Sequence, residues 1–304
     1  MKKILIIFIS LFISTVATNA NELENTLNKV YGKGSEVVED YITNLLDGPG
    51  STEVSIGTKR NKERDFDEPT GSIMIVRPYN SDSINNNSVI FYQAQINSFE
   101  VNNSIRQSIN YGIGKRFLSD DKSHFWGINT FFDADTERNS RLGLGSEYKA
   151  SNFSMNGNYY LDPFGQEQKV DTNTERVLEG YDINIAGQVP YVPWANINYN
   201  NYTWLAQKAS QNSEGEMYSG TFNLSNDYTL EVGVDDNNFM STRTFAKLIY
   251  IHGAKKRPNM NDGFTSVEAF QDSDVSKDML TKVKRSNIIT LEIEGTGVVI
   301  ANGN

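Results

Sequence analysis

The stretch that decides the fold runs from Phe125 to Leu161 and reads FWGINTFFDADTERNSRLGLGSEYKASNFSMNGNYYL. Side chains of opposite character alternate along it. In its middle, one face carries Leu142, Leu144 and Tyr148, and the other carries Arg141, Gly143, Gly145 and Glu147. A period of two residues indicates β-strands. The connections 135–138 and 149–151 are too short to hold crossover helices, so neighbouring strands are predicted to be antiparallel.

The same alternation extends over most of the chain and predicts about twelve strands. They cover residues 51–58, 71–78, 88–100, 103–117, 124–134, 139–148, 152–161, 177–189, 195–207, 214–225, 227–236 and 241–252. Most are longer than the roughly five or six residues usual in soluble proteins. They match the roughly 9–11 residues that a tilted strand needs to cross a bilayer.

The two faces of these strands suit different surroundings, the polar face water and the apolar face lipid. Inward-pointing charges and amides require water or partners, which a wet lumen supplies. The residues predicted to face this lumen are Arg106, Asn110, Arg141, Glu147, Asp182, Asn184 and Glu231. Aromatic residues make up 11% of the chain, and no long apolar run follows the first twenty residues, which favours a barrel with an apolar exterior. A soluble sandwich, which also alternates, is the alternative.

The first twenty residues have the features of a secretory signal peptide. Lys2 and Lys3 precede an apolar run from Ile4 to Ile13, and Thr18-Asn19-Ala20 is a plausible cleavage site. An N-terminal membrane anchor is the alternative, but the run is short for a span. Removing the signal changes the formal charge from -10 to -12, which argues against nucleic acid as a partner. The chain has no cysteine and therefore no disulfide.

The segments on either side of the strands are predicted to contain helices. Residues 21–50 form a periplasmic helical lead-in, the barrel spans 51–252, and 253–304 is a linker. A helix at about 273–286 would place Val275, Met279 and Val283 on one apolar stripe that packs inside the pore. Alternatively, the first helix packs on a soluble core and the second lies at the periplasmic surface. With an even strand count, both barrel ends lie in the periplasm and the longest loop, 162–176, faces outward.

Several blocks of the sequence resemble the β-domain of inverse autotransporters, the intimin and invasin family. The blocks are FWGINTFFDADTERNSRLGLGSEY, NFSMNGNYYLD, EGYDINIAGQVP and, in the tail, VKRSNIITLEI; the likeness spans roughly Tyr41 to Ile293. The resemblance implies a twelve-stranded outer-membrane barrel that anchors a C-terminal passenger at the cell surface. It also implies that the helix near 275–285 threads the pore and that Ile288 to Ile293 reaches the outside.

The sequence departs from that family at both ends. Residues 294–304 are too few for an immunoglobulin-like adhesin domain of about 100 residues. Residues 21–50 are too few for the family's N-terminal peptidoglycan-binding module. We therefore expect adhesin-like export of a very short segment. A stand-alone pore for small solutes and a split system with its passenger on another polypeptide are the alternatives.

Few residues suggest chemistry, and we expect no enzymatic activity and no cofactor. His124 and His252 are the only histidines, and no His or Cys cluster has zinc spacing. Two acidic pairs, Asp133 with Asp135 and Asp235 with Asp236, could hold a divalent cation or lie in solvated loops. The basic run Lys59, Arg60, Lys62 and Arg64 could touch lipid phosphates or be solvated. Expected partners are outer-membrane lipid, lipopolysaccharide, the barrel-assembly machinery and periplasmic chaperones; the sequence indicates no surface receptor.

Overall fold

The computed structural model describes residues 48–61, 67–79, 87–101, 104–165, 167–252, 256–270, 272–294 and 297–299. The chain divides into two units, Met1–Gly48 and Pro49–Asn304, and nearly all described residues belong to the second. The expected signal peptide, the expected lead-in helix, and the basic residues Lys62 and Arg64 lie outside the described residues. Those three expectations stay predictions.

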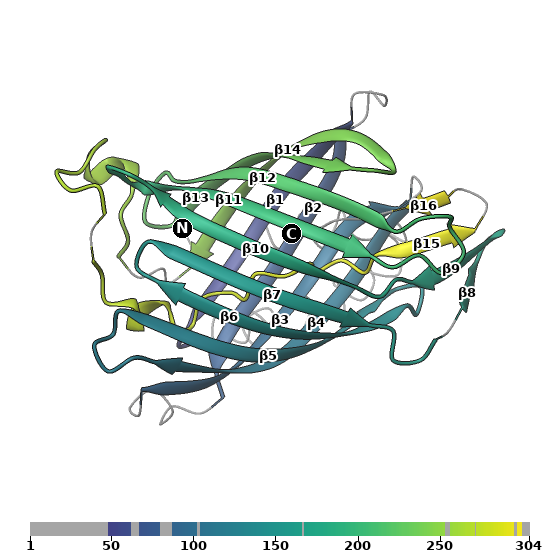
Figure 1. Ribbon diagram of the computed structural model, residues 1–304, viewed down its shortest axis with the longest axis horizontal. Helices are drawn as coiled ribbons and strands as arrows, with labels where there is room; N and C mark the ends of the chain where they lie inside the picture. The colour runs from purple at the N-terminus through teal and green to yellow at the C-terminus, as the bar shows by residue number, and fades with distance from the viewer. Residues whose placement is uncertain are drawn as a thin grey trace, which may run out of the picture. The chain divides into compact units, whose positions relative to one another are not determined.

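Twelve antiparallel strands form a closed barrel (Figure 1). The strands are β1 (Ser51–Asn61), β2 (Asp67–Pro78), β3 (Ser88–Val101), β4 (Ser104–Leu118), β5 (His124–Asp135), β6 (Ser140–Ala150), β7 (Phe153–Leu161), β10 (Gly180–Val189), β11 (Val192–Trp204), β12 (Ser213–Asn223), β13 (Tyr228–Asn237) and β14 (Met240–His252). Sequence neighbours pair around the ring, and β1 closes it against β14. The predicted fold class, a twelve-stranded antiparallel up-and-down barrel, is confirmed.

The alternation that predicted the strands also separates their two faces. In β4, Ile109, Tyr111 and Ile113 are 53%, 53% and 41% exposed, whereas Asn110 between the first two is completely buried. Along β4, polar side chains thus point inward and apolar side chains point outward. That distribution is the reverse of a soluble protein and suits a barrel surrounded by lipid.

The two ends of the barrel differ, and we name them by the strands. The end where β1 begins and β14 ends is called the proximal end, and the opposite end is the distal end. Exposed aromatic side chains lie on the outer face toward both ends. They are Trp126, Tyr148, Phe153 and Tyr228 toward the proximal end, and Phe132, Tyr159 and Tyr181 toward the distal end. Such girdles mark the two interfaces between lipid and water.

The long connection between β7 and β10 is not the plain loop that the sequence predicted. It contains a hairpin, β8 (Glu167–Val170) and β9 (Asn173–Val177), joined by a turn in which Asp171 has a φ of 53°. Left-handed φ values are typical of such two-residue turns and are tolerated by Asp. β9 pairs with β15 (Leu291–Glu294), which pairs with β16 (Gly297–Val299), and the result is a four-stranded sheet at the distal end.

The predicted pore helix at about 273–286 is wrong. The structure has one 3-10 turn there, η3 (Val275–Asp278), capped by the Asp274 side chain, and the chain then continues in irregular extended form to β15. The start signal was correctly recognised, but the barrel wall supplies the hydrogen bonds that a longer helix would make internally, as described below. Among the described residues, no helix has the length and apolar character required to cross a membrane.

The exposed apolar face generates a prediction. Ile113→Lys places a charge on the outer face of β4, between the positions that pair with Trp126 and with Phe132 of the two girdles, and we expect it to lower the free energy of unfolding from bilayers by about 2–4 kcal/mol. The measurement is urea unfolding of the protein reconstituted in vesicles, with Ile113→Leu as the matched control. Equal stability of the two variants would mean that this face does not meet lipid.

Candidate functional site

The lumen of the barrel is occupied by residues 272–294, which we call the threaded segment. At the proximal end, the Val275 N–H donates to the Lys122 carbonyl in the β4–β5 turn over 3.0 Å. At the distal end, Leu291 to Glu294 pair with β9. The yellow chain in Figure 1 runs between these two points within the ring of strands. One continuous segment therefore passes through a closed barrel.

Apolar contacts fix the proximal half of this segment. Val275 is completely buried, and Met279 packs with it against Val89 and Phe125. Further along, Val283 is 1% exposed and packs in a cluster with Met74, Val76, Phe91 and Phe131. The structure thus places the three residues of the predicted apolar stripe, Val275, Met279 and Val283, against the wall. Extended chain rather than a helix carries the last of them there.

Arg116 on β4 links the wall to the threaded segment. Its guanidinium lies 4.3 Å from the Phe91 ring and 5.2 Å from the Phe125 ring. It donates to the Met279 and Thr281 carbonyls over 2.9 and 2.8 Å, and it forms an ion pair of 2.7 Å with Glu147. The side chain is completely buried. Stacking, a countercharge and two backbone acceptors together compensate for its desolvation.

Asp133 on β5 holds the centre of the threaded segment. Its carboxylate accepts from Arg285 over 2.6 and 2.9 Å, from Arg141 over 2.9 and 3.0 Å, and from the Asn110 amide over 2.7 Å. Asp133 and Arg141 are both completely buried. Arg285 lies on the threaded segment and Arg141 on the wall, so one carboxylate neutralises charge on both sides of the contact. Buried ions of this kind are tolerated only when paired in this way.

Side chains of the wall satisfy the backbone of the threaded segment. Its carbonyls at Lys284, Ser286 and Asn287 accept from Asn158, Arg141 and Asn110 over 3.0, 2.8 and 2.8 Å. The Ser286 N–H donates to the Tyr160 hydroxyl, which donates to Asp182. A buried backbone group must find a partner, and here the partners come from the strands. This is the physical reason why the segment does not need to be helical.

Glycines on the wall provide space for the threaded segment. A Cβ atom added at Gly143 would lie 2.9 Å from the Arg285 guanidinium, and one at Gly112 would lie 2.3 Å from the Phe131 ring. Phe131 in turn stacks under Arg285, at 4.3 Å. Small residues at inward positions therefore leave room for the cluster of Asp133, Arg141, Arg285 and Asn110, which we call the Asp133 clamp.

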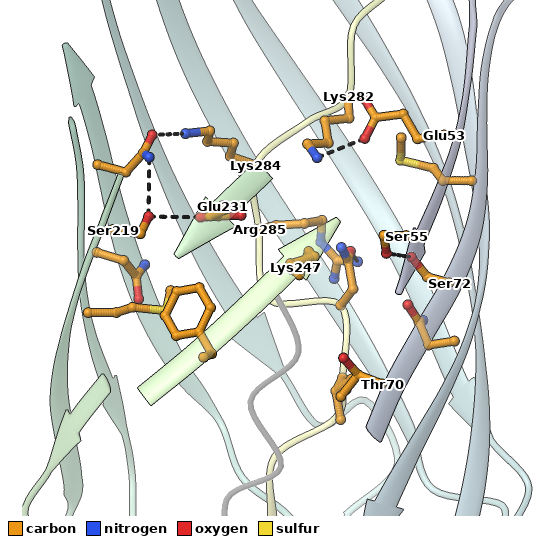
Figure 2. A pocket seen from close by; sticks show the side chains of 18 of the residues that line it. Glu53, Ser55, Thr70, Ser72, Ser219, Glu231, Lys247, Lys282, Lys284 and Arg285 are labelled. Atoms are coloured by element: carbon orange, nitrogen blue, oxygen red, sulfur yellow. Dashed lines mark hydrogen bonds and ion pairs between the residues drawn. The ribbon is translucent and has the colours of Figure 1, made fainter. Parts of the chain in front are cut away.

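The other side of the lumen holds a polar cavity of about 120 Å³. Lys282 forms an ion pair of 2.7 Å with Glu53, and the Ser219 hydroxyl donates to Glu231 on the adjacent strand over 2.8 Å. Figure 2 draws both interactions on the wall of the cavity. Lys284 donates to Asn198 over 2.7 Å. About 10–15 Å³ is enough for one water molecule, so several fit. The threaded segment thus has a packed side, toward Phe91, Phe131 and Asp133, and a side facing this cavity.

The distal end is closed by apolar packing and by a buried carboxylate. Phe99, Val101 and Val177 pack with the side chains of Ile288, Ile289, Leu291 and Ile293. Glu292 points away from that cluster and accepts the backbone N–H groups of Gln207, Lys208 and Ala209 over 2.8–3.2 Å. Its carboxylate sits in a nest of backbone donors and fixes the loop between β11 and β12 to the threaded segment.

Comparison with known proteins identifies this arrangement. A family model described as the inverse autotransporter beta-domain matches residues 10–246, most of the chain. The chain belongs to the inverse autotransporter β-domain family. It is accordingly an outer-membrane β-barrel, as the resemblance in the sequence predicted. No curated protein matched the chain.

Solved structures similar to this inverse autotransporter β-domain are also membrane barrels. A protein structure from a study of the in-meso crystallization of membrane proteins is 18% identical, with 80% of this chain and all of that chain covered and a TM-score of 0.60. A KdgM porin is 11% identical over 65% of this chain and 98% of its own, with a TM-score of 0.42. Outer membrane phospholipase A from Escherichia coli is 12% identical over 67% and 97%, with a TM-score of 0.45. The first likeness supports the fold alone.

The residues predicted to face the lumen occupy different parts of the inverse autotransporter β-domain. Asn110 and Arg141 belong to the Asp133 clamp, and Glu147 pairs with Arg116. The Asp182 carboxylate accepts a hydrogen bond from the Tyr160 hydroxyl and another from the Asn184 amide, the latter over 2.6 Å. Glu231 lines the polar cavity. Arg106 lies toward the distal end and pairs with Glu175 of β9 over 2.7 Å.

The sequence did not predict the roles of several other residues of the site. Arg116 and Asp133 lie at inward positions of predicted strands, so strand parity could have placed them in the lumen, although the sequence offered Asp133 only as a possible cation ligand. Tyr160 connects Ser286 to Asp182 and likewise lies at an inward position of a predicted strand. Glu292 carries no local signal, because its donors lie 83–85 residues away in the sequence.

Three of the four carboxylates in the two acidic pairs are engaged by arginines of the protein itself. Asp133 is held by two arginines, and Asp135 pairs with Arg106 over 3.2 Å. Asp235 is 1% exposed and pairs with Arg243 over 2.6 Å. The expectation of solvated loops is therefore wrong for Asp133 and Asp235. No group of three or more His, Cys, Asp or Glu side chains in the described ranges could hold a metal ion.

The β4–β5 turn brings an Asp, a Ser and a His together. The Asp121 carboxylate accepts from Ser119, from the Ser123 hydroxyl and from the Ser123 N–H, and these hydrogen bonds lower its pKa to about 2. The Ser123 hydroxyl lies 3.0 Å from the His124 ring. In a hydrolytic triad the carboxylate orients the histidine, whereas here it binds the serine. The cluster stabilises the turn and lacks the geometry for nucleophilic catalysis.

The Asp133 clamp generates a prediction. Asp133→Asn removes the countercharge of Arg141 and Arg285 and should lower the free energy of unfolding by up to about 3–5 kcal/mol. The measurement is urea unfolding in vesicles. The matched control is Asp236→Asn, because Asp236 is exposed and contacts only the Thr242 hydroxyl among the described hydrogen bonds. Equal small losses from both variants would contradict a central role for the clamp.

The distal sheet should loosen in acid. Arg176 of β9 donates to Glu167 over 2.7 Å and to Glu294 of β15 over 2.9 Å. The hydrogen bond from Arg176 lowers the pKa of Glu167 below its ordinary value of 4.5. The stabilisation is therefore complete above pH 4.5 and is lost as the pH falls through the lowered pKa.

This pH dependence can be measured by hydrogen exchange. Protection factors of amides 167–177, corrected for intrinsic rates, should fall severalfold between pH 6 and pH 3. The effect is modest because exposed ion pairs are weak. Glu167→Gln should show lowered protection already at pH 6 and a smaller further change. If the variant and the original chain respond alike, Glu167 is not the titrating group.

Proposed function

We propose that this β-domain anchors and exports its own C-terminal segment, so that the chain beyond the threaded segment lies at the cell surface in an adhesin-like position. The observation that supports this proposal is the single segment that passes through a closed ring and emerges paired to β9. Because the two ends of the segment contact opposite ends of the barrel, the C-terminal side of Glu294 lies across the membrane from Val275. We assign the distal end to the outside, since long loops of such barrels face outward.

The proposal includes a set of partners and assigns no catalytic activity. The outer face contacts outer-membrane lipid and lipopolysaccharide, and the barrel-assembly machinery with periplasmic chaperones inserts the chain. Export follows an N-terminal secretory signal. The tail beyond β15 is the part of the chain available to a surface receptor.

Labelling of intact cells tests this topology. The chain has no cysteine, so single cysteines can be introduced at Thr172 in the β8–β9 turn and at Asn261 near the proximal end, both of which are exposed. A membrane-impermeant maleimide should label Thr172→Cys, and an antibody should detect a tag after Asn304, on intact cells. Asn261→Cys should react only after permeabilisation. A tag at Asn304 that is detected only in permeabilised cells would refute the export proposal.

The polar cavity beside the threaded segment favours a second candidate, a channel for small solutes. The two functions differ in conductance. In planar bilayers, we expect little current from the whole protein and more after deletion of residues 263–304, because that deletion removes the threaded segment. A large steady current through the whole protein would favour the channel.

A further inference from the structure

The chain between β14 and the threaded segment does not enter the barrel directly. Residues 256–270, which we call the strap, run along the proximal end, seen at the left of Figure 1 in yellow-green. Arg257 bonds to Asn226 in the β12–β13 turn, and Tyr191 in the β10–β11 turn exchanges backbone hydrogen bonds with Ser266 and Ala269. Beyond the strap, Ser273 bonds to Ser151 in the β6–β7 turn. The chain thus follows one proximal turn after another before Val275 reaches the β4–β5 turn.

The strap carries large apolar side chains that the described residues leave about half or more exposed. Val267 is 97% exposed, Phe264 is 69% exposed and Phe270 is 48% exposed. The backbone nearby is held by the hydrogen bonds to Tyr191, so these side chains are displayed from a fixed position. Apolar patches that are exposed on an ordered surface usually mark an interaction site.

An aromatic chain connects this patch to the lipid-facing side of the barrel. Phe222 lies on the outer face of β12. It is four residues from Tyr218, which is 48% exposed, so both side chains are on the same face, and the Phe222 ring lies over Gly220 between them. The Trp194 ring lies 6.2 Å from Phe222 and 6.0 Å from Phe264, and its N–H donates to the Phe264 carbonyl over 3.0 Å. The strap therefore extends the proximal aromatic girdle without interruption.

We propose that the strap is an interfacial membrane contact, with Phe264, Val267 and Phe270 inserted among the phospholipids of the leaflet at the proximal end. Phe and Trp are favoured at that depth, and a lipid surface accepts a row of unrelated apolar side chains without requiring a complementary pocket. The leaflet and the four proximal turns described above then fix the place where the threaded segment enters the lumen. This inference depends on the barrel fold and does not require that the C-terminal segment be exported.

Single-cysteine probes test the contact, again because the chain has no cysteine. Val267→Cys is labelled with a nitrobenzoxadiazole fluorophore, and the protein is reconstituted in vesicles of dibrominated phosphatidylcholine. The matched control is Glu268→Cys, the adjacent exposed position, and Ile197→Cys on the outer face of β11 is the lipid reference. We expect strong bromine quenching at positions 267 and 197 and weak quenching at position 268.

Reactivity toward a water-soluble thiol reagent gives the second measurement. In vesicles, Val267→Cys should react roughly tenfold more slowly than Glu268→Cys, because burying a Val-sized group is worth at least that factor. Equal reactivity and no quenching at position 267 would overturn the proposal. Slow reactivity without quenching would also overturn it, since the patch would then be covered by protein and not by lipid. Each probe replaces an exposed side chain, so all three variants should retain the barrel.

Discussion

A shared counterion is the interaction on which the interior of this barrel depends. Asp133 belongs to the wall, and its two arginine partners belong to the wall and to the threaded segment. Without Arg285, the carboxylate and Arg141 would still form a pair, and water could enter to hydrate the groups that Arg285 leaves. The barrel can therefore stay folded without the threaded segment. In the core of a soluble protein, by contrast, removing one partner of an ion pair leaves a buried charge that water cannot reach. This property suits the export proposed above, in which the tail of the domain passes through its own barrel.

The same polar wall explains why the threaded segment is extended. A helix would use its own backbone hydrogen-bonding groups. Asn110, Asn158 and Tyr160 would then lose their hydrogen bonds to the threaded segment. The extended chain presents a carbonyl or N–H to each of them. It places Val283 in the apolar cluster and Arg285 on Asp133, whereas the Lys282 and Lys284 side chains reach Glu53 and Asn198. Period two thus applies to the linker as well as to the strands. The pattern of Val275, Met279 and Val283 fits both conformations, and the wall decides between them.

The sequence predicted the parts of the fold that depend on local order. Strand parity predicted twelve strands and their two faces, because side-chain alternation is a property of neighbouring residues. The short connections predicted the antiparallel order. It did not give the pairing of β15 with β9 or the nest around Glu292, since those contacts join segments far apart in the chain. The helix-start signal at Asp274 was correct, but it led to a single 3-10 turn and not to a longer helix. The apolar stripe predicted that the segment packs inside the pore, and the resemblance to a family predicted that it passes through to the outside.

The contacts that hold the threaded segment differ along its length. In the middle they are mostly hydrogen bonds and ion pairs, for which water is an acceptable substitute. At the distal end the apolar cluster around Ile289 and Leu291 is a contact that water cannot replace, and the backbone pairing of β15 with β9 adds to it. At the proximal end Val275 and Met279 are buried against Phe125, and the chain before them is bonded to successive turns. A segment whose ends are fixed and whose middle can exchange with solvent can slide only before its ends have formed. In the proposed export, passage through the lumen therefore comes first and closure of the distal sheet comes last.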